Sequence, residues 1–390
     1  MRLMTTSRRT ALAGAAIAVI AALGLSACGS SGGAGGGSST AGNSTSSGAG
    51  AGSSSAGSET SSAGSETSSA DGGQGSGAAK GDHSFIYITN NPIGVNEFLG
   101  LGDKGIKDAA AKFGGTSKTY ESTDVASQRA NIEAAIDAQP DVIVLITFDF
   151  TDLSKEYAEK NPDQQFVLID ACPTDPPKNL HCAVFREQEA SYLVGLEAGM
   201  LTKTKKVGSV VAVDIPFLHR YSDTFAHSAQ KVDPSITDTQ LFIGGSSPFA
   251  DPGKGKEQAL ALAATGVDQV FAVGAGSNGG IMEAAKEKNF FTYGVDVNQC
   301  GMAPGHVVDN TMKAVDVLVV TEIGKILDGT ARSLSSYGLK ENGMNVTSLM
   351  DGAANSGCVV MDHPDVLAKV KQARQDIIDG KITIPDPAAG

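Results

Sequence analysis

Residues 267–299 carry the clearest structural signal in the chain and read VDQVFAVGAGSNGGIMEAAKEKNFFTYGVDVNQ. The apolar run Asp268–Val273 indicates a buried strand, and Ile281–Lys288 has the pattern of a helix. Phe291–Val295 indicates a second strand, with Asp296 at its end. This succession is a βαβ unit, and open α/β sheets bind their ligands at the carboxyl ends of such strands. The stretch therefore predicts a parallel sheet with a binding edge.

Strands and helices alternate on both sides of this unit. The further strands expected are Phe85–Thr89, Lys118–Glu121, Val142–Thr147, Gln165–Asp170, Ala183–Phe185, Lys206–Val213, Thr239–Gly244 and Val307–Thr311. The further helices expected are Leu101–Phe113, Ala126–Ala138, Leu153–Lys160, Glu187–Leu201, Phe217–Val232, Lys254–Thr265, Val315–Leu327 and Asp365–Ile378. Such alternation is typical of a parallel sheet with helices on both faces.

Residues 81–390 are too many for one simple core, which indicates two lobes. We expect an α/β fold in which each lobe is a doubly wound, mostly parallel sheet. Lobe 1 is expected to hold 81–186 with about 308–334, and lobe 2 to hold 187–307 with about 335–390. The chain would then cross between the lobes near Arg186, Val308 and Leu334. A pair of lobes joined in this way closes on a ligand by hinge motion.

The first 27 residues have the features of an export signal. Arg8 and Arg9 belong to a positively charged N-terminal region. The apolar stretch Ala11–Leu25 follows it and, at about 15 residues, is short for a membrane span. It ends in Leu25–Cys28, which reads LSAC and resembles the bacterial lipobox, where the cysteine is acylated after cleavage. An ordinary signal peptide with a chance cysteine is the alternative. The paired arginines leave both the general and the twin-arginine export routes open.

Residues 28–80 are almost all Gly, Ser, Ala and Thr after Cys28, and AGSETSS occurs twice in tandem from Ala56. With few large apolar side chains, this stretch is expected to be a disordered tether with a reach of roughly 40 Å. Residues 81–390 hold 26 of the 30 Lys and Arg and 40 of the 43 Asp and Glu, a formal charge of −14. That charge argues against nucleic acid as a partner.

Four cysteines remain after Cys28, and an even number outside the cytoplasm indicates disulfides. Three pairings are possible. We favour Cys172–Cys182, because the loop between them is short and rich in proline, which leaves Cys300–Cys358. Free buried thiols are the alternative. No C-x-x-C is present, and the spacing does not indicate zinc or another metal.

The glycine-rich segment admits several interpretations. Gly274, Gly276 and Gly279 form G-x-G-x-x-G, and Asp296 follows at the next strand end, as in dinucleotide sites. A nicotinamide-dependent enzyme is one interpretation. Against it, nicotinamide cofactors are not available outside the cell to an exported protein, and the βαβ unit comes late in the chain. A plain glycine turn with a solvated Asp296 is another. The interpretation that we favour is a binding site at which bare backbone admits the ligand and the carboxylate accepts its hydroxyl groups.

No arrangement of residues typical of catalysis is present: G-x-S-x-G and H-E-x-x-H are absent, and no S-x-x-K stands beside a partner motif. Glu187 and Glu189 start a helix, where acidic residues are favoured electrostatically, so we assign them a structural role. We therefore expect no enzyme activity and no cofactor.

Other candidate ligand contacts follow the ends of strands. Residues 90–98 read NNPIGVNEF; its Asn amides can bond a base edge and Phe98 can stack on it, although an Asn-rich turn with a core Phe98 remains open. Phe148 and Phe217 either line the same crevice or cover the sheet end, with Asp149 beside the first. Lys313 starts a helix, where a cation opposes the dipole, so either a bond to ligand hydroxyls or a surface position remains open.

Seven motifs agree in order and spacing with a known family. They are FREQEASYLVG at 185–195, TKTKKVG at 202–208, DIP at 214–216, DPGKGK at 251–256, EAAKE at 283–287, GVD at 294–296 and MKAVD at 312–316. The chain resembles the basic membrane protein family, the substrate-binding lipoproteins of ABC transporters, across most of Ser84–Gly329.

This resemblance implies a two-lobed type I periplasmic-binding fold that captures a nucleoside. The base would stack between aromatic rings. Asp296, the backbone at Gly274–Gly276 and Lys313 would hold the ribose. The first loop departs from the family, which usually has an acidic residue followed by Ser-Phe-Asn, so the base specificity is expected to differ. A buried polar group left unpaired costs about 1–3 kcal/mol, which would reject the wrong base.

The sequence therefore predicts a lipid-anchored extracytoplasmic receptor that delivers a nucleoside-like ligand to an ABC permease. A monomer at the cell membrane, held through Cys28, is expected. A receptor for another sugar-bearing or small polar metabolite, and a surface lipoprotein acting as a sensor or adhesin, remain open. The candidate ligand contacts are Asn91, Asn96, Phe98, Phe148, Asp149, Phe217, Gly274, Gly276, Asn278, Asp296 and Lys313.

Overall fold

A computed structural model describes residues 81–389 of the chain. The predicted export signal, the predicted lipid attachment at Cys28 and the predicted tether all concern residues outside the described ones. Within 81–389 no helix is long and apolar enough to cross a membrane.

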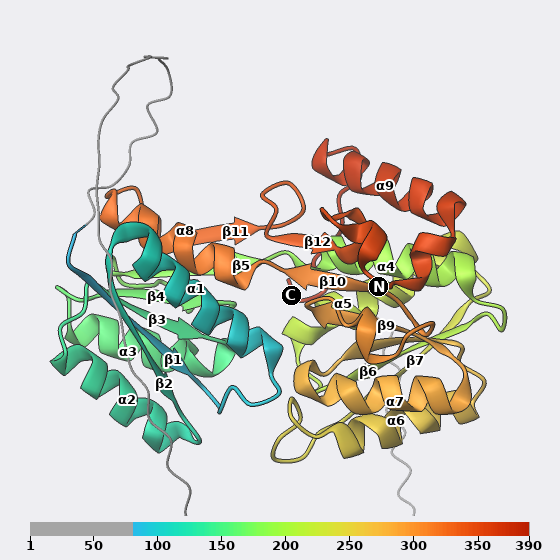
Figure 1. The fold of residues 1–390 in the computed structure, drawn as a ribbon, viewed down its shortest axis with the longest axis horizontal. Helices are drawn as coiled ribbons and strands as arrows, with labels where there is room; N and C mark the ends of the chain where they lie inside the picture. Colours follow the sequence, from blue (N-terminus) through green and yellow to red (C-terminus); the bar gives the residue numbers. More distant parts are fainter. Residues whose placement is uncertain (1–80, 390) are drawn as a thin grey trace, which may run out of the picture. The chain divides into compact units, whose positions relative to one another are not determined.

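Lobe 1 is built on a sheet of six parallel strands in the order β11-β5-β4-β3-β1-β2 (Figure 1). The strands are β1 His83–Thr89, β2 Gly115–Glu121, β3 Val142–Ile146, β4 Gln165–Ile169, β5 Leu180–Phe185 and β11 Leu334–Tyr337. Its helices are α1 Glu97–Phe113, α2 Val125–Asp137, α3 Thr151–Lys160 and α8 Val315–Leu327.

Lobe 2 is built on a second six-stranded sheet in the order β12-β10-β9-β8-β6-β7, of which β12 alone runs antiparallel. The strands are β6 Lys206–Val211, β7 Thr237–Phe242, β8 Gln269–Val273, β9 Phe291–Asp296, β10 Val307–Lys313 and β12 Met344–Val346. Its helices are α4 Glu187–Leu201, α5 Pro216–Val232, α6 Pro252–Ala264, α7 Asn278–Lys288 and α9 Pro364–Ile378. The two sheets confirm the predicted α/β class with one mostly parallel sheet per lobe.

Both faces of each sheet are buried, which explains the apolar runs in the sequence. In β1, Phe85 and Tyr87 belong to the cluster on the α1 side, while Ile86 and Ile88 pack with Ile132 of α2. In lobe 2 the α6 and α7 side has its own buried cluster. Parallel strands covered by helices place all their carboxyl ends at one edge.

The chain crosses between the lobes three times, as expected, but two crossings lie further along than predicted. The first is at Arg186, between β5 and α4. β10 pairs with β9 through Met312, so the crossing predicted near Val308 follows Lys313 instead. The third follows Tyr337 rather than Leu334, because β11 extends the sheet of lobe 1.

Helix α1 begins four residues before its predicted start. The side chain of Asn96 accepts a hydrogen bond from the Leu99 backbone N–H at 3.4 Å and caps the helix. The glycine-rich stretch forms a turn that leads directly into a helix. Ala275–Ser277 form one 3-10 turn, and Gly279 and Gly280 belong to α7.

Two disulfides join the four cysteines in the predicted pairing, Cys172–Cys182 and Cys300–Cys358. The first fastens the segment after β4 to β5 in lobe 1. The second fastens the turn after β9 to the segment before α9 in lobe 2. Each closes a loop in its own lobe, so neither restricts movement between the lobes.

Candidate functional site

A cleft lies where the carboxyl ends of the two sheets face each other. It encloses about 590 Å³ of space free of protein atoms, part of it open solvent. Both lobes line it, with the residues Asn90, Asn91, Asn96, Phe98, Thr147, Phe148, Asp170, Phe217, Leu218, Tyr221, Phe249, Val273, Ala275, Val295, Asp296 and Lys313.

Three strands end in strained backbone beside this cleft. Thr147 after β3, Asp170 after β4 and Asp296 at the end of β9 have φ angles of 80°, 75° and 70°. Residues other than glycine rarely adopt such angles, and each instance costs about 1–3 kcal/mol. All three residues line the cleft. Strain concentrated in this way is typical of a functional site.

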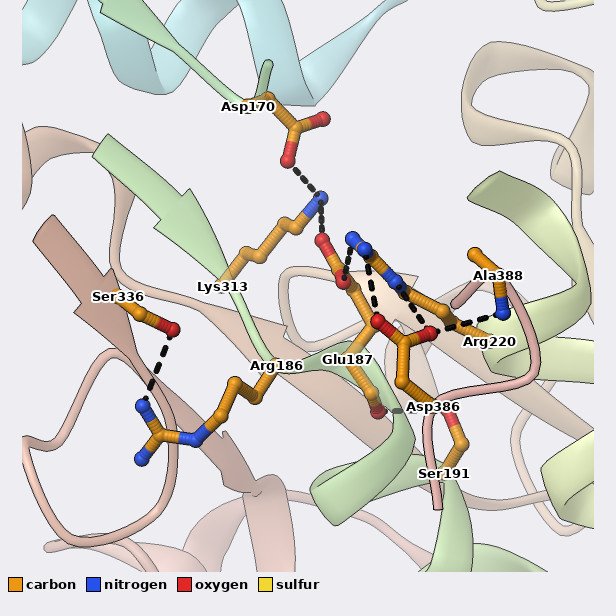
Figure 2. A network of polar contacts seen from close by, with 9 residues as sticks. All are labelled: Asp170, Arg186, Glu187, Ser191, Arg220, Lys313, Ser336, Asp386 and Ala388. Carbon is orange, nitrogen blue, oxygen red and sulfur yellow. Dashed lines mark hydrogen bonds and ion pairs between the residues drawn. The ribbon is translucent and has the colours of Figure 1, made fainter. Parts of the chain in front are cut away.

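Lys313, at the end of β10, is the central cation of the cleft and is almost fully buried. Its Nζ lies 2.7 Å from Oδ1 of Asp170 and 3.1 Å from Oε1 of Glu187 (Figure 2). Asp170 belongs to lobe 1, whereas Lys313 and Glu187 belong to lobe 2. The ion pair with Asp170 therefore joins the two lobes.

The buried carboxylates and this ammonium shift one another's pKa. Burial raises the pKa of Asp296 to about 6 and that of Asp170 to about 7, although Lys313 lowers both. Burial lowers the pKa of Lys313, but Asp170, Glu187 and Asp296 more than offset this and raise it well above its ordinary value. Lys313 therefore stays charged.

Aromatic rings cover the ammonium and form the apolar part of the cleft. Nζ of Lys313 lies 5.2 Å from the ring centre of Phe98, 5.1 Å from that of Phe217 and 5.6 Å from that of Tyr221. Phe148 of lobe 1 approaches Phe217 of lobe 2 with ring centres 6.2 Å apart. Rings from both lobes can hold a flat, unsaturated ligand between them.

Asp296 is the carboxylate of this cluster that lacks a hydrogen-bond donor among the described residues. Its side chain is buried and lines the cleft, yet none of residues 81–389 donates a hydrogen bond to its carboxylate. A buried charged acceptor without donors is costly. A ligand with two neighbouring hydroxyl groups would supply the missing donors.

The first loop of lobe 1 brings amides to the other side of the cleft. Asn90 Nδ2 donates to Asp149 Oδ2 at 2.5 Å, which fixes how the amide is turned. Its Oδ1 is buried and has no partner among the described residues. Asn90 thus presents an acceptor, a role that the sequence analysis did not assign to it.

Seven of the eleven predicted contacts line the cleft, namely Asn91, Asn96, Phe98, Phe148, Phe217, Asp296 and Lys313. Asp149 does not, and instead holds Asn90. The backbone of Gly274 and the side chain of Asn278 are bonded to each other at 2.9 Å, and Asn278 also bonds Gln299 at 3.0 Å. Gly276 packs on Val95 of lobe 1, so the lobes touch there.

The sequence analysis missed Asp170, Tyr221 and Glu187. Asp170 follows a buried strand just as Asp296 does, so the same reasoning could have identified it. Glu187 was assigned a structural role at a helix start, but it is fully buried and contacts Lys313. Among the described residues no group of three His, Cys, Asp or Glu is arranged to hold a metal ion.

Comparison with known proteins identifies the family to which the chain belongs. The chain is 27% identical over 317 residues to the CD4+ T-cell-stimulating antigen of Listeria monocytogenes, covering 75% of this chain and 87% of the relative. It is 28% identical over 291 residues to the ABC transporter nucleoside-binding protein BmpA of Lactococcus lactis, covering 70% and 79%.

A solved ABC transporter solute-binding protein from Aeropyrum pernix superposes with a TM-score of 0.68 at 25% identity, covering 78% of this chain and 94% of that one. Residues 96–386 match the family described as ABC transporter substrate-binding protein PnrA-like. Members of this family bind a small-molecule substrate for a transporter. The chain belongs to the Bmp family of ABC transporter substrate-binding proteins.

Proposed function

We propose that this protein captures a nucleoside between its two lobes and delivers it to an ABC importer. The observation that carries the proposal is the unpaired, buried carboxylate of Asp296 beside the ammonium of Lys313. A ribose places two adjacent hydroxyl groups on one edge, and these can donate to the carboxylate. The rings of Phe98, Phe148 and Phe217 offer faces for the base.

The relative from Lactococcus lactis supports the same ligand class, because its name states that it binds nucleosides. We further propose that Cys28 carries a lipid and holds the protein as a monomer on the outer face of the cell membrane, where the permease receives the ligand. The LSAC sequence at 25–28 supports this anchor. The receptor changes nothing in its ligand and is not an enzyme.

A thermal-shift and calorimetry screen tests the ligand class. The purified full chain is mixed with nucleosides, free bases, pentoses and hexoses. A nucleoside at about 100 times its dissociation constant stabilises the folded state by about 2.7 kcal/mol, which raises Tm by several degrees. Shifts with sugars alone would instead favour a receptor for another metabolite, and shifts with no compound of the panel would contradict the proposal.

The variant Asp296→Asn separates site binding from non-specific effects. It keeps the size of the side chain but removes the charge that strengthens hydrogen bonds from hydroxyl groups. We expect nucleoside affinity to fall by at least about tenfold, since such bonds contribute about 1.5–3 kcal/mol. Asp163→Asn is the matched control, because Asp163 is exposed and does not line the cleft.

A further inference from the structure

The C-terminal segment after α9 returns across lobe 2 and ends in a fixed carboxylate. Ile382 and Ile384 pack on the hydrophobic core. Beyond them, Asp386 accepts hydrogen bonds from Nε and Nη2 of Arg220, both at 2.9 Å, and from the Ala388 backbone N–H at 2.9 Å. A bidentate pair of this kind fixes the orientation of the guanidinium group as well as its position.

Arg220 connects this pair to the binding cleft. Its Nη1 lies 3.3 Å from Oε2 of Glu187, and the other oxygen of Glu187 lies 3.1 Å from Nζ of Lys313. Figure 2 shows the unbroken succession from Asp386 through Arg220 and Glu187 to Lys313 and Asp170. The guanidinium of Arg220 also lies 5.9 Å from the ring centre of Phe217, which lines the cleft.

The charges in this succession alternate, so each member balances its neighbours. Glu187 is fully buried, and each of its two carboxylate oxygens faces one of the two cations. Arg220 in turn is shared between two carboxylates. If Asp386 lost its charge, Arg220 would be left with Glu187 alone and would draw that carboxylate away from Lys313. The ammonium of Lys313 would then shift toward Asp170 on the opposite lobe.

We propose that Asp386 is a positioning residue for ligand binding. It does not line the cleft, but it holds Arg220 so that Glu187 orients the ammonium of Lys313 and Phe217 keeps its ring in place. The C-terminal segment is thereby a working part of the binding site. This inference rests on the proposed function, because Lys313 and Phe217 matter to a ligand bound in this cleft.

The test compares two carboxylates of the same segment in the purified full chain. Asp386→Asn is expected to weaken binding about tenfold for the nucleoside that gives the largest thermal shift among adenosine, guanosine, inosine, cytidine and uridine. Asp379→Asn is the control, because Asp379 pairs with Lys381 at 3.0 Å and has no link to Arg220. Equal affinities of the wild type and Asp386→Asn would overturn the inference.

A double-mutant cycle separates positioning from a general effect on folding. If Asp386 acts through Arg220, the variant Arg220→Gln with Asp386→Asn binds no more weakly than Arg220→Gln alone. Losses of affinity that add up would show a merely structural role and contradict the proposal. Should Asp386→Asn fail to fold, Arg220→Lys gives the same information, since lysine keeps the charge but cannot form the bidentate pair.

A measurement without ligand keeps this inference separate from the proposed function. The ¹H–¹⁵N signal of the Lys313 ammonium, assigned with Lys313→Met, is recorded in the ligand-free wild type and in Asp386→Asn. A shifted signal supports the positioning role, and an unchanged one overturns it. Failure of the wild type to bind any nucleoside contradicts the proposed function, whichever result this spectrum gives.

Discussion

Asp296 combines three properties that are individually uncommon: a buried carboxylate, no hydrogen-bond donor among residues 81–389, and a left-handed backbone. Each property costs free energy in the ligand-free protein. A bound pair of hydroxyl groups would donate to the carboxylate and remove the cost of leaving it without donors. This relief of an existing cost adds to the affinity for the ligand. Affinity should therefore depend on the ionisation of this carboxylate.

Nucleoside affinity is expected to fall as the pH drops through about 6. Burial raises the pKa of Asp296 to about 6, with Glu97 and Glu187 raising it further and Lys313 lowering it. The ionised carboxylate accepts bonds from hydroxyl groups, whereas the protonated form loses one of its acceptors. Calorimetry between pH 5 and pH 8 checks this, and Asp296→Asn should flatten the profile near pH 6. A wild-type affinity that is constant across this range would contradict the role of Asp296.

Asp309 of β10 should make folding less stable as the pH rises. Burial raises its pKa from 3.8 to about 6, while bonds from Ser348 and Asn310 lower it, and Glu197 faces it with a pKa that burial and Asp309 raise. A raised folded-state pKa gives stability that is present below pH 4 and lost as the pH passes 6. The free energy of unfolding of Asp309→Asn, relative to that of the wild type, should therefore rise by up to about 3 kcal/mol between pH 4.5 and pH 7.5.

Urea unfolding at both pH values measures this difference. Asp238→Asn in β7 is a second case, because burial raises the pKa of Asp238 to about 6 as well, and this variant should become more stable than the wild type over the same pH range. A gap between wild type and Asp309→Asn that stays the same at both pH values would show that Asp309 is not charged at neutral pH.

Sequence motifs predicted two of the charged residues in the cleft, but not those whose partners are distant in the sequence. Asp296 and Lys313 were identified from GVD and MKAVD. Asp170 was not, although it follows a buried strand as Asp296 does; only its pairing with Lys313, 143 positions away, leaves no local pattern in the sequence. Glu187 was misread for the same reason: its position at a helix start explained the carboxylate without any partner.

At the scale of elements, the long strands and helices were predicted and the crossings were misplaced. β10 reads VVDNTMK, and all of its first five residues are buried although three of them are polar. Asp309 and Asn310 are satisfied by bonds from other segments, including one from the Ser348 backbone N–H and one to Thr347. The strand was predicted at Val307–Thr311, but an apolar pattern does not reveal that it continues through Met312 to Lys313. β11 and β12, with four and three residues, are too short for any pattern.

The contact between α6 and α7 should not tolerate a side chain at Gly280. A Cβ placed there would lie 1.7 Å from the carbonyl oxygen of Pro252, so one helix would have to move. Gly280→Ala is expected to lower the free energy of unfolding by about 1–3 kcal/mol or more. Gly279→Ala is the matched control, since the nearest atom to its Cβ is Met302 Cε at 4.0 Å.

Urea unfolding of both variants checks the packing of these helices. Gly279→Ala should be neutral or slightly stabilising, because alanine favours a helix over glycine by up to about 1 kcal/mol. Equal stability of the two variants would contradict the close approach of α6 to α7.

At the scale of the whole molecule, polar contacts tie the crossings together. Arg186 at the first crossing bonds Glu189, Glu341 and Ser336, which lie on α4 and on either side of the third crossing. Across the cleft, Gln299 Nε2 of lobe 2 donates to Glu97 of lobe 1 at 3.3 Å. The first set of bonds lies where the chain crosses between the lobes, and the second joins the lobes across the cleft.

The attachment of the protein is predicted from sequence alone. Cys28→Ser should release the chain from membranes, since serine in the LSAC sequence cannot carry the lipid. Membrane fractionation of cells that express each form measures this, with Cys172→Ser as a control that leaves the proposed anchor intact. A Cys28→Ser chain that stays in the membrane fraction would refute lipid attachment at this position.

The carboxylates of Asp170, Glu187 and Asp296 surround the single ammonium of Lys313. A phosphate group entering the cleft would add negative charge to a cluster in which carboxylates already outnumber the cation, and no second ammonium is at hand to receive it among the residues that line the cleft. Nucleotides should therefore bind to this receptor much more weakly than nucleosides. A cell that feeds on them through this route would first have to remove their phosphates outside the membrane, so nutrient capture would depend on a secreted or surface phosphatase.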